Sequence, residues 1–277
     1  MKKIISTAVA VLTLVFHTLV VAEVPGHANA LLSNKTVPFF VHPVYPPDQA
    51  EQVFASLLSY LNEHCECTLE LVTFRDFHAY RRAMTQGFPP GFVLEEAHLA
   101  SMRIERYGYQ PIVRDNAEVR YHLVALRGGE DQTQRDLVGR PVATMASPSM
   151  GYIQLDRWFP DPVQAPIFKS DARSWQDAVE MVFAGEAVAA VVPDSVASQY
   201  PNLETLRYSA SYPSSTVLAN PAVPPLLVSG VKDAMLRLAS DENQYETLNE
   251  LGIAGFQQAR PLDYIADGRI ARYLVGY

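Results

Sequence analysis

The chain has 277 residues, of which 48% are hydrophobic and 19% charged, so it can bury a core of its own and is neither a disordered nor a collagen-like chain. Its length suits one large domain or two lobes, and we expect two. Thirty acidic residues against 22 Lys and Arg give a net charge of −8. This balance argues against a broad basic surface and therefore against nucleic acid as a partner.

The N-terminus predicts export. Two lysines follow the first methionine, and residues 4–22 are apolar apart from small hydroxyl residues and one histidine, which is the pattern of a secretory signal peptide. Cleavage after Ala22 and cleavage after Ala30 both fit, and helix breakers upstream of the second site favour Ala30. We therefore expect a signal peptide over residues 1–30 and a periplasmic protein. An inner-membrane tether is the alternative, because the apolar run is long enough to span a bilayer.

Strand-like and helix-like segments alternate from residue 36 to residue 126. Residues 36–41 (TVPFFV) predict a buried strand that the proline-rich residues 42–47 end, and apolar residues at helical spacing follow over 54–61. The alternation continues with strands at 69–74, 92–94, 111–114 and 119–126 and helices at 77–84 and 97–107. It implies a mostly parallel sheet with helices on both faces.

A second lobe is predicted to begin at the polar, glycine-rich residues 127–131. Its predicted elements are strands at 142–145 and 187–192 and helices at 151–158 and 174–183. The Ser- and Tyr-rich residues 208–216 suit a segment that crosses back, and two amphipathic helices follow it. These helices would complete the first lobe.

The predicted fold is thus α/β with two lobes, each a mostly parallel sheet flanked by helices. The first lobe is discontinuous and takes residues 31–126 and 212–277, and the second takes residues 127–211. The two crossings between them are expected to form a hinge.

Both cysteines, Cys65 and Cys67, lie in one short turn between a predicted helix and a predicted strand. An exported chain meets disulfide-forming machinery, so a local disulfide fits, and two free thiols fit as well. A metal site that includes His64 is the weaker alternative, because structural zinc usually takes four ligands at wider spacing. We expect no metal and no cofactor.

Four turns follow predicted strands, at the edge where open α/β sheets bind ligands. They are residues 42–45, 95–98, 146–152 and 193–195. In the third (SPSMGY at 147–152), serine hydroxyls stand beside the N-terminus of a helix, where backbone N–H groups can hold an oxyanion without a full positive charge. Serine also caps helices at this position, so capping is the competing interpretation.

The order of several short motifs carries a family resemblance. The motifs are HPVYP at 42–46, AH at 97–98, GYQP at 108–111, YHLVA at 121–125, DLVGRPVA at 136–143 and SPSMGY at 147–152. Together they resemble the periplasmic phosphate/phosphite/phosphonate-binding proteins of ABC importers, the phosphonate-binding branch of the type 2 solute-binding proteins. The resemblance spans residues 36 to 238.

The resemblance implies a type 2 periplasmic binding protein that captures a small phosphonate-, phosphite- or phosphate-like oxyanion between its lobes and delivers it to an ABC permease. The ligand-binding candidates that it implies are Tyr45, His98, Tyr121, Ser147, Ser149, Gly151, Tyr152 and Asp194.

The chain also departs from the family pattern. Pro148 and Met150 replace hydroxyl residues of a fuller serine turn, and Glu95 and Glu96 near the expected cleft would repel a dianion unless a ligand amine or a proton offsets them. An aminoalkyl phosphonate, a sulfonate or a different small ligand is therefore left open.

Other functions than transport are compatible with parts of the sequence. The sequence contains no nucleophile motif, zinc-protease motif or nucleotide-binding loop, so we do not expect an enzyme. A sensor of the same fold, signalling to a membrane kinase or cyclic-nucleotide signalling protein, is the main alternative, and a protein whose cleft has lost its ligand is a third. We expect a monomer in each case.

Overall fold

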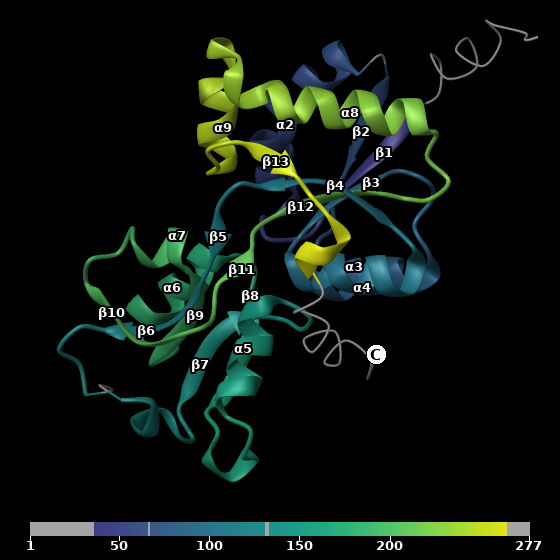
Figure 1. The fold of residues 1–277 in the computed structure, drawn as a ribbon. Helices are drawn as coiled ribbons and strands as arrows, with labels where there is room; N and C mark the ends of the chain where they lie inside the picture. Colours follow the sequence, from purple (N-terminus) through teal and green to yellow (C-terminus); the bar gives the residue numbers. More distant parts are fainter. Residues whose placement is uncertain (1–35, 66, 131–132, 265–277) are drawn as a thin grey trace, which may run out of the picture.

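The structure is a computed structural model that describes residues 36–65, 67–130 and 133–264. Within them the chain forms two α/β lobes joined by two crossing segments (Figure 1). The predicted signal peptide lies outside the described residues. In the part of the chain that the structure describes, no helix is long and apolar enough to cross a membrane.

The first lobe is built on a mixed six-stranded sheet. Its strand order is β13-β4-β12-β3-β1-β2, with β1 parallel to β2 and β3 and with β12 antiparallel to β3 and β4. The strands are β1 (Thr36–Val41), β2 (Thr68–Val72), β3 (Phe92–Glu95), β4 (Gln110–Asp115), β12 (Thr216–Ala219) and β13 (Phe256–Gln258). The late strands β12 and β13 run against the others, so the sheet is less parallel than the sequence predicts.

Helices cover both faces of this sheet (Figure 1). They are α2 (Pro47–His64), α8 (Pro225–Arg237) and α9 (Tyr245–Leu251) on one face, and α3 (Phe77–Gln86) and α4 (Ala97–Tyr107) on the other. The short helices η3 (Leu238–Ser240) and η4 (Glu242–Gln244) link α8 to α9. Asp76 caps α3 by accepting from the backbone N–H of Ala79, and Gly108 ends α4 in the left-handed conformation that favours glycine.

The second lobe is built on a five-stranded sheet of order β10-β6-β9-β7-β8. Its elements are β6 (Tyr121–Leu126), η1 (Gln134–Leu137), β7 (Pro141–Met145), α5 (Met150–Trp158), η2 (Pro162–Gln164), β8 (Ile167–Ala172), α6 (Trp175–Phe183), β9 (Ala189–Pro193), α7 (Asp194–Ala197) and β10 (Leu203–Tyr208). The apolar strand β9 is fully buried between β6 and β7.

The structure corrects the predicted boundary between the lobes. Strand β6 was placed in the first lobe by the prediction of residues 31–126, but it pairs with β9 from Tyr121 to Ala125 and belongs to the second sheet. The crossing lies before it, where β5 (Glu118–Val119) pairs with β11 (Tyr212–Pro213). The glycine-rich residues after β6 are a turn within the second lobe, because polar composition marks a surface loop and does not say which sheet the neighbouring strands join.

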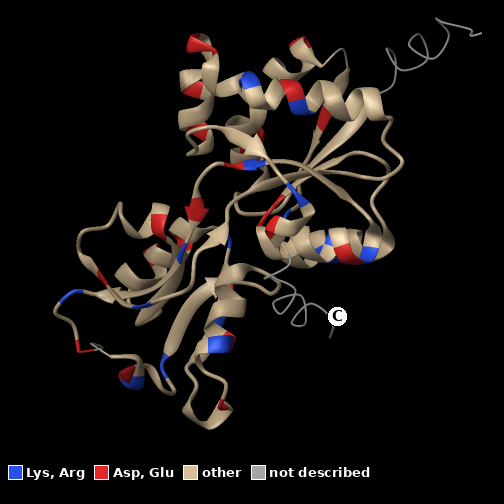
Figure 2. Cartoon of the chain, viewed as in Figure 1, with Lys and Arg blue, Asp and Glu red and all other residues tan. Residues whose placement is uncertain are grey.

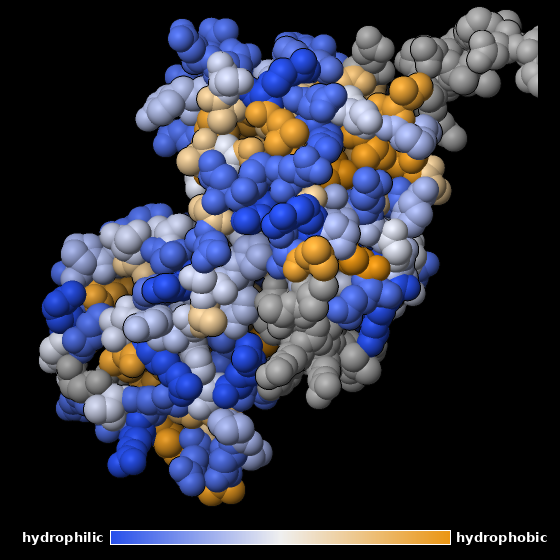
Figure 3. All heavy atoms as spheres, in the orientation of Figure 1, coloured by the Kyte–Doolittle hydropathy of each residue, from blue (hydrophilic) through white to orange (hydrophobic). Residues whose placement is uncertain are grey.

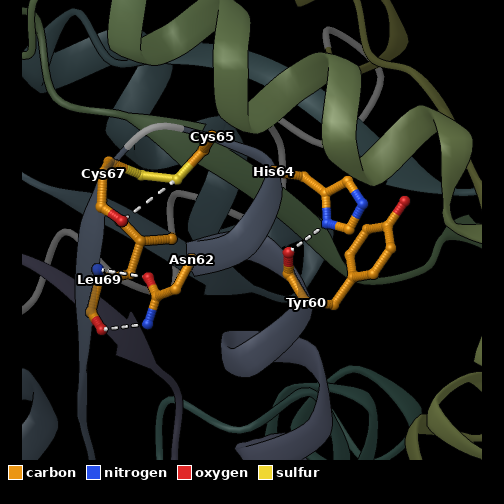
Figure 4. Close-up of a disulfide and its surroundings, with 6 residues drawn as sticks. All are labelled: Tyr60, Asn62, His64, Cys65, Cys67 and Leu69. Carbon is orange, nitrogen blue, oxygen red and sulfur yellow. Dashed lines mark hydrogen bonds between the residues drawn. A yellow bond between two sulfur atoms is a disulfide. The ribbon is translucent and has the colours of Figure 1, made fainter.

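The two cysteines form a disulfide at the end of α2. Cys65 and Cys67 are joined, and the side chain of Asn62 bonds both the N–H and the carbonyl of Leu69 at the start of β2 (Figure 4). The His64 ring bonds the carbonyl of Tyr60 at 2.8 Å. Of the interpretations left open by the sequence, the structure has the local disulfide, and it helps fix the turn from α2 to β2.

Candidate functional site

A cleft of about 740 Å³ lies between the lobes. The first lobe lines it from the ends of β1 and β3 and from α2 and α9, and the second lobe lines it from β6, α6 and α7. The polar and aromatic residues that line the cleft include His42, Tyr45, Phe54, Glu96, Asp115, Glu118, Tyr121, Trp175, Gln176, Asp194, Ser195, Gln199, Ser214, Ser215 and Glu250. In Figure 3 the visible face of the molecule is mostly hydrophilic, with the larger hydrophobic patches on the first lobe.

The cleft is acidic. Its described lining includes five carboxylates but neither lysine nor arginine. They belong to Glu96, Asp115, Glu118, Asp194 and Glu250. Figure 2 shows acidic residues on β5 and at α7, where the two lobes meet. An anionic group in this cleft would therefore face negative charge with no full positive charge from the described lining side chains.

The histidine in the cleft does not supply that positive charge. His42 follows β1, and its Nδ1 lies 3.1 Å from the carbonyl oxygen of Leu94. Burial lowers the pKa of His42 to about 4, so the imidazole is neutral near pH 7.

Aromatic rings form part of the cleft wall. Tyr45 meets Phe54 edge to face with ring centres 6.4 Å apart, and Tyr121 lies 5.8 Å from Trp175. Burial raises the pKa of Tyr45, which keeps its phenol neutral. Aromatic faces of this kind attract cations, because the ring carries negative potential on its faces.

Glu96 connects the two lobes. It stands at the end of β3 and is 9% exposed. Its Oε1 accepts a 2.6 Å hydrogen bond from the hydroxyl of Tyr121 on β6, and the backbone N–H of Met150, the first residue of α5, lies close enough to favour the charged carboxylate. Burial raises the pKa of Glu96 to about 7, although these two donors act in the opposite direction.

His98 lies beside Glu96 in the first turn of α4. The ring is fully buried, and its Nε2 lies 2.8 Å from the carbonyl oxygen of Pro148 in the second lobe. Burial lowers the pKa of His98 to about 4, so the ring is neutral and must carry its proton on Nε2 to donate to that carbonyl. Its Nδ1 lies 3.8 Å from Glu96 Oε2, and neither of these two buried atoms has a hydrogen bond of normal geometry.

The predicted serine turn has mainly structural contacts. Ser149 is fully buried, donates to the carbonyl of Met145 at 2.8 Å and accepts from the N–H of Tyr152 at 3.2 Å, so it caps α5. A Cβ at Gly151 would lie 2.4 Å from the hydroxyl oxygen of Thr144, so glycine is needed there for packing. The described cleft lining includes no residue from 147 to 152.

The structure thus separates the eight predicted ligand residues into groups. Tyr45, Tyr121 and Asp194 line the cleft. His98 lies behind Glu96, while the serine-turn residues Ser147, Ser149, Gly151 and Tyr152 lie outside the lining. The role of Glu96 between the lobes was missed. A carboxylate at the carboxyl end of a buried strand was the available signal.

The other carboxylate of that pair, Glu95, belongs to a different environment. Arg103 Nε lies 2.7 Å from Glu95 Oε1, and the hydroxyl of Tyr80 donates to Glu95 Oε2. Arg103 also donates to Tyr80 at 3.1 Å and stacks over the ring of Phe88. This buried cluster lies inside the first lobe and does not line the cleft.

The chain matches a family model over residues 39–264. The family is described as "ABC transporter, phosphonate, periplasmic substrate-binding protein". The chain belongs to this family. Its members are periplasmic substrate-binding proteins of ABC importers that bind small phosphonate ligands and are not enzymes, which confirms the family, the fold class and the absence of catalysis expected from the sequence. The signal peptide stays a prediction.

Solved structures share the family fold at low sequence identity. PhnD1 from Prochlorococcus marinus in complex with methylphosphonate is 13% identical in sequence and has a TM-score of 0.74. The match covers 88% of this chain and 99% of the PhnD1 chain. A binding protein component of an ABC phosphonate transporter from Pseudomonas aeruginosa is 11% identical and has a TM-score of 0.72, and the match covers 86% of each chain. An ancestral arginine-binding protein bound to arginine is 14% identical, with coverage of 78% and 97% and a TM-score of 0.56. No curated protein matches the chain by sequence.

Proposed function

We propose that the cleft between the lobes captures a small solute that joins a phosphonate-like oxyanion to a positively charged nitrogen, as an aminoalkyl phosphonate does. The observation that carries this proposal is the cleft lining, which among the described residues includes five acidic residues but neither a lysine nor an arginine. The family supplies the oxyanion part of the proposal, and the charge of the cleft supplies the nitrogen.

Electrostatics favour a solute of this kind over a simple oxyanion. Two unit charges 4 Å apart interact by about 4 kcal/mol at the effective dielectric of a protein surface, so even one unpaired carboxylate near a dianion costs much of its binding energy. A solute nitrogen removes that cost. The rings of Tyr45 and Trp175 offer it further contacts, because aromatic faces attract cations.

Neutral donors remain for the oxyanion part of the solute. Hydroxyl and amide groups of Ser195, Ser214, Ser215, Gln176 and Gln199 line the same cleft. Hydrogen bonds from such groups hold an oxyanion without a full positive charge.

Thermal unfolding of the periplasmic protein tests the proposal. The panel is 2-aminoethylphosphonate, methylphosphonate, phosphate, sulfate and taurine. A solute at about 100 times its dissociation constant adds roughly 2.7 kcal/mol to the stability of the folded state. We expect the amine-bearing phosphonate to raise Tm most. An equal or larger rise with methylphosphonate or phosphate would contradict the role assigned to the nitrogen.

Delivery to an ABC permease is the second part of the proposal, with the chain acting as a monomer. A same-fold sensor would bind the same solute but contact a membrane receptor. Uptake of labelled solute by cells with and without the protein separates the two, since only the importer component is required for uptake. Sedimentation of the purified protein checks the monomer.

A further inference from the structure

We propose that Glu96 is the specificity-determining residue of the cleft, because its carboxylate acts as a resident anion at the N-terminus of α5 and excludes simple oxyanions from that position. The proposal deepens the proposed function and rests on it only in taking the cleft as the place where solutes enter.

The N-terminus of α5 has the properties of an anion site. The helix has nine residues, and its first backbone N–H groups have no partner within the helix. Ser149 satisfies the N–H of Tyr152, and the carboxyl group of Glu96 lies close to the N–H of Met150. Above about pH 7, where this group is a carboxylate, a negative charge is therefore already present where the partial positive charge of the helix is concentrated.

The bound carboxylate comes from the opposite lobe and lacks a full counter-charge. Glu96 is nine-tenths buried. The ring of His98 lies 3.8 Å from its Oε2 but is neutral, and this oxygen has no hydrogen bond of normal geometry. Tyr121 supplies the remaining hydrogen bond, at 2.6 Å. A buried carboxylate with so few partners is not explained by stability alone, since burial of a charge is costly unless it is fully paired.

The position of Glu96 explains why its removal would change selectivity. Glu96 lines the cleft, while the residues of the serine turn behind it do not. In Figure 1 the start of α5 faces the first lobe. His98 of the first lobe bonds the carbonyl of Pro148, two residues before α5, and Glu96 bonds Tyr121 of the second lobe. Truncation of the Glu96 side chain would connect the helix N-terminus to the cleft. A small oxyanion would then find the donors of Met150 and Tyr121 without the competing carboxylate.

The test compares Glu96→Ala with two matched variants. Wild-type protein, Glu96→Ala, Glu96→Gln and Glu118→Gln are each titrated with phosphate, methylphosphonate and sulfate. Glu118→Gln removes one negative charge from the cleft without touching α5, and Glu96→Gln removes the same charge while its amide still fills the position. We expect Glu96→Ala to gain affinity for at least one of these anions by about tenfold or more, with a rise in Tm of about 5 °C or more at saturation. The wild type should show little binding, and the two control variants, which remove one charge without opening the position, should gain clearly less affinity than Glu96→Ala.

Several outcomes would overturn the inference. These are tight oxyanion binding by the wild type, an equal gain in Glu118→Gln, or no gain in a folded Glu96→Ala. If Glu96→Ala does not fold, Glu96→Ser provides a similar opening with a small polar side chain at the position. Failure of the proposed function is seen separately. The proposed function fails if the amine-bearing phosphonate does not change the Tm of the wild type. That result does not affect the comparison of anion affinity between Glu96→Ala and the control variants.

Discussion

Glu95 and Glu96 are consecutive residues at the end of β3, and both are buried, but they end in opposite environments. Glu95 meets Arg103 at 2.7 Å and the hydroxyl of Tyr80 inside the first lobe. Glu96 crosses to the second lobe, where its partners are the hydroxyl of Tyr121 and one backbone N–H. Glu95 is the last residue of β3 and Glu96 continues the extended backbone as the cap residue of α4, so their successive side chains point to opposite sides.

The difference separates scaffold from site. A buried carboxylate with a guanidinium beside it has its charge balanced and holds its lobe together. A buried carboxylate without a full counter-charge can change its protonation near neutral pH, and its contacts depend on the solute and on how the two lobes lie. Four changes test this contrast, from the largest expected effect to the smallest.

The largest effect is expected at the Glu95 cluster. Arg103→Met leaves the Glu95 carboxylate buried without its cation, and we expect the free energy of unfolding to fall by about 3–5 kcal/mol. Urea denaturation measures it. The double variant Glu95→Gln/Arg103→Met should recover part of the loss, because the uncompensated charge is gone. A loss below about 1 kcal/mol in the single variant would contradict the scaffold role.

The next effect is the pH dependence of Glu96→Gln. The pKa of Glu96 is raised from 4.5 to about 7 in the folded state, so the folded state binds this proton more tightly than the unfolded state. The stability that it contributes is therefore present below about pH 4.5 and is lost as pH rises through about 7, by up to about 3 kcal/mol. The advantage of wild type over Glu96→Gln should shrink accordingly as pH rises.

Urea denaturation of both proteins at several pH values measures that difference. Burial lowers the pKa of both His42 and His98 to about 4, so these rings reduce stability as pH falls below their unfolded value near 6.5. Both proteins contain them, so their contribution cancels in the difference to first order. A difference that does not change with pH would show that Glu96 does not titrate near neutrality.

A smaller effect is expected from Tyr121→Phe. It removes the 2.6 Å hydrogen bond to Glu96, and a hydrogen bond to a charged group is worth about 1.5–3 kcal/mol. The loss should be greater above about pH 7, where the carboxylate is charged, than near pH 5. Tyr45→Phe is the control, since its hydroxyl has no hydrogen bond to Glu96 among the described residues. Equal losses at both pH values would count against the charge-assisted bond.

The smallest effect is expected from Ser149→Ala. Loss of the N-cap should cost about 1 kcal/mol, and solute affinity measured by calorimetry should stay unchanged because the serine turn lies outside the cleft lining. The reverse result, a loss of affinity without a loss of stability, would place Ser149 in the binding site.

The sequence by itself determined the alternation of strands and helices, the mixed α/β class and the family. These features depend on local patterns, such as the apolar spacing over residues 54–61, which act within a few residues of the chain. The motif order identified the family for the same reason, since each motif is a short local segment. Tyr45 and Asp194 were expected near the cleft because the carboxyl ends of strands meet at one edge of a sheet, and Tyr121 because the family resemblance implies it.

Only the tertiary structure decided which sheet β6 joins and what each carboxylate meets. Polar residues after β6 indicated a boundary, but its pairing with β9 depends on residues more than sixty positions away. Likewise, the same two-residue motif at 95–96 gives one carboxylate an arginine and the other a helix N-terminus in a second lobe. Charge, burial and partners of these groups are set by contacts between distant segments, and no local pattern contains them.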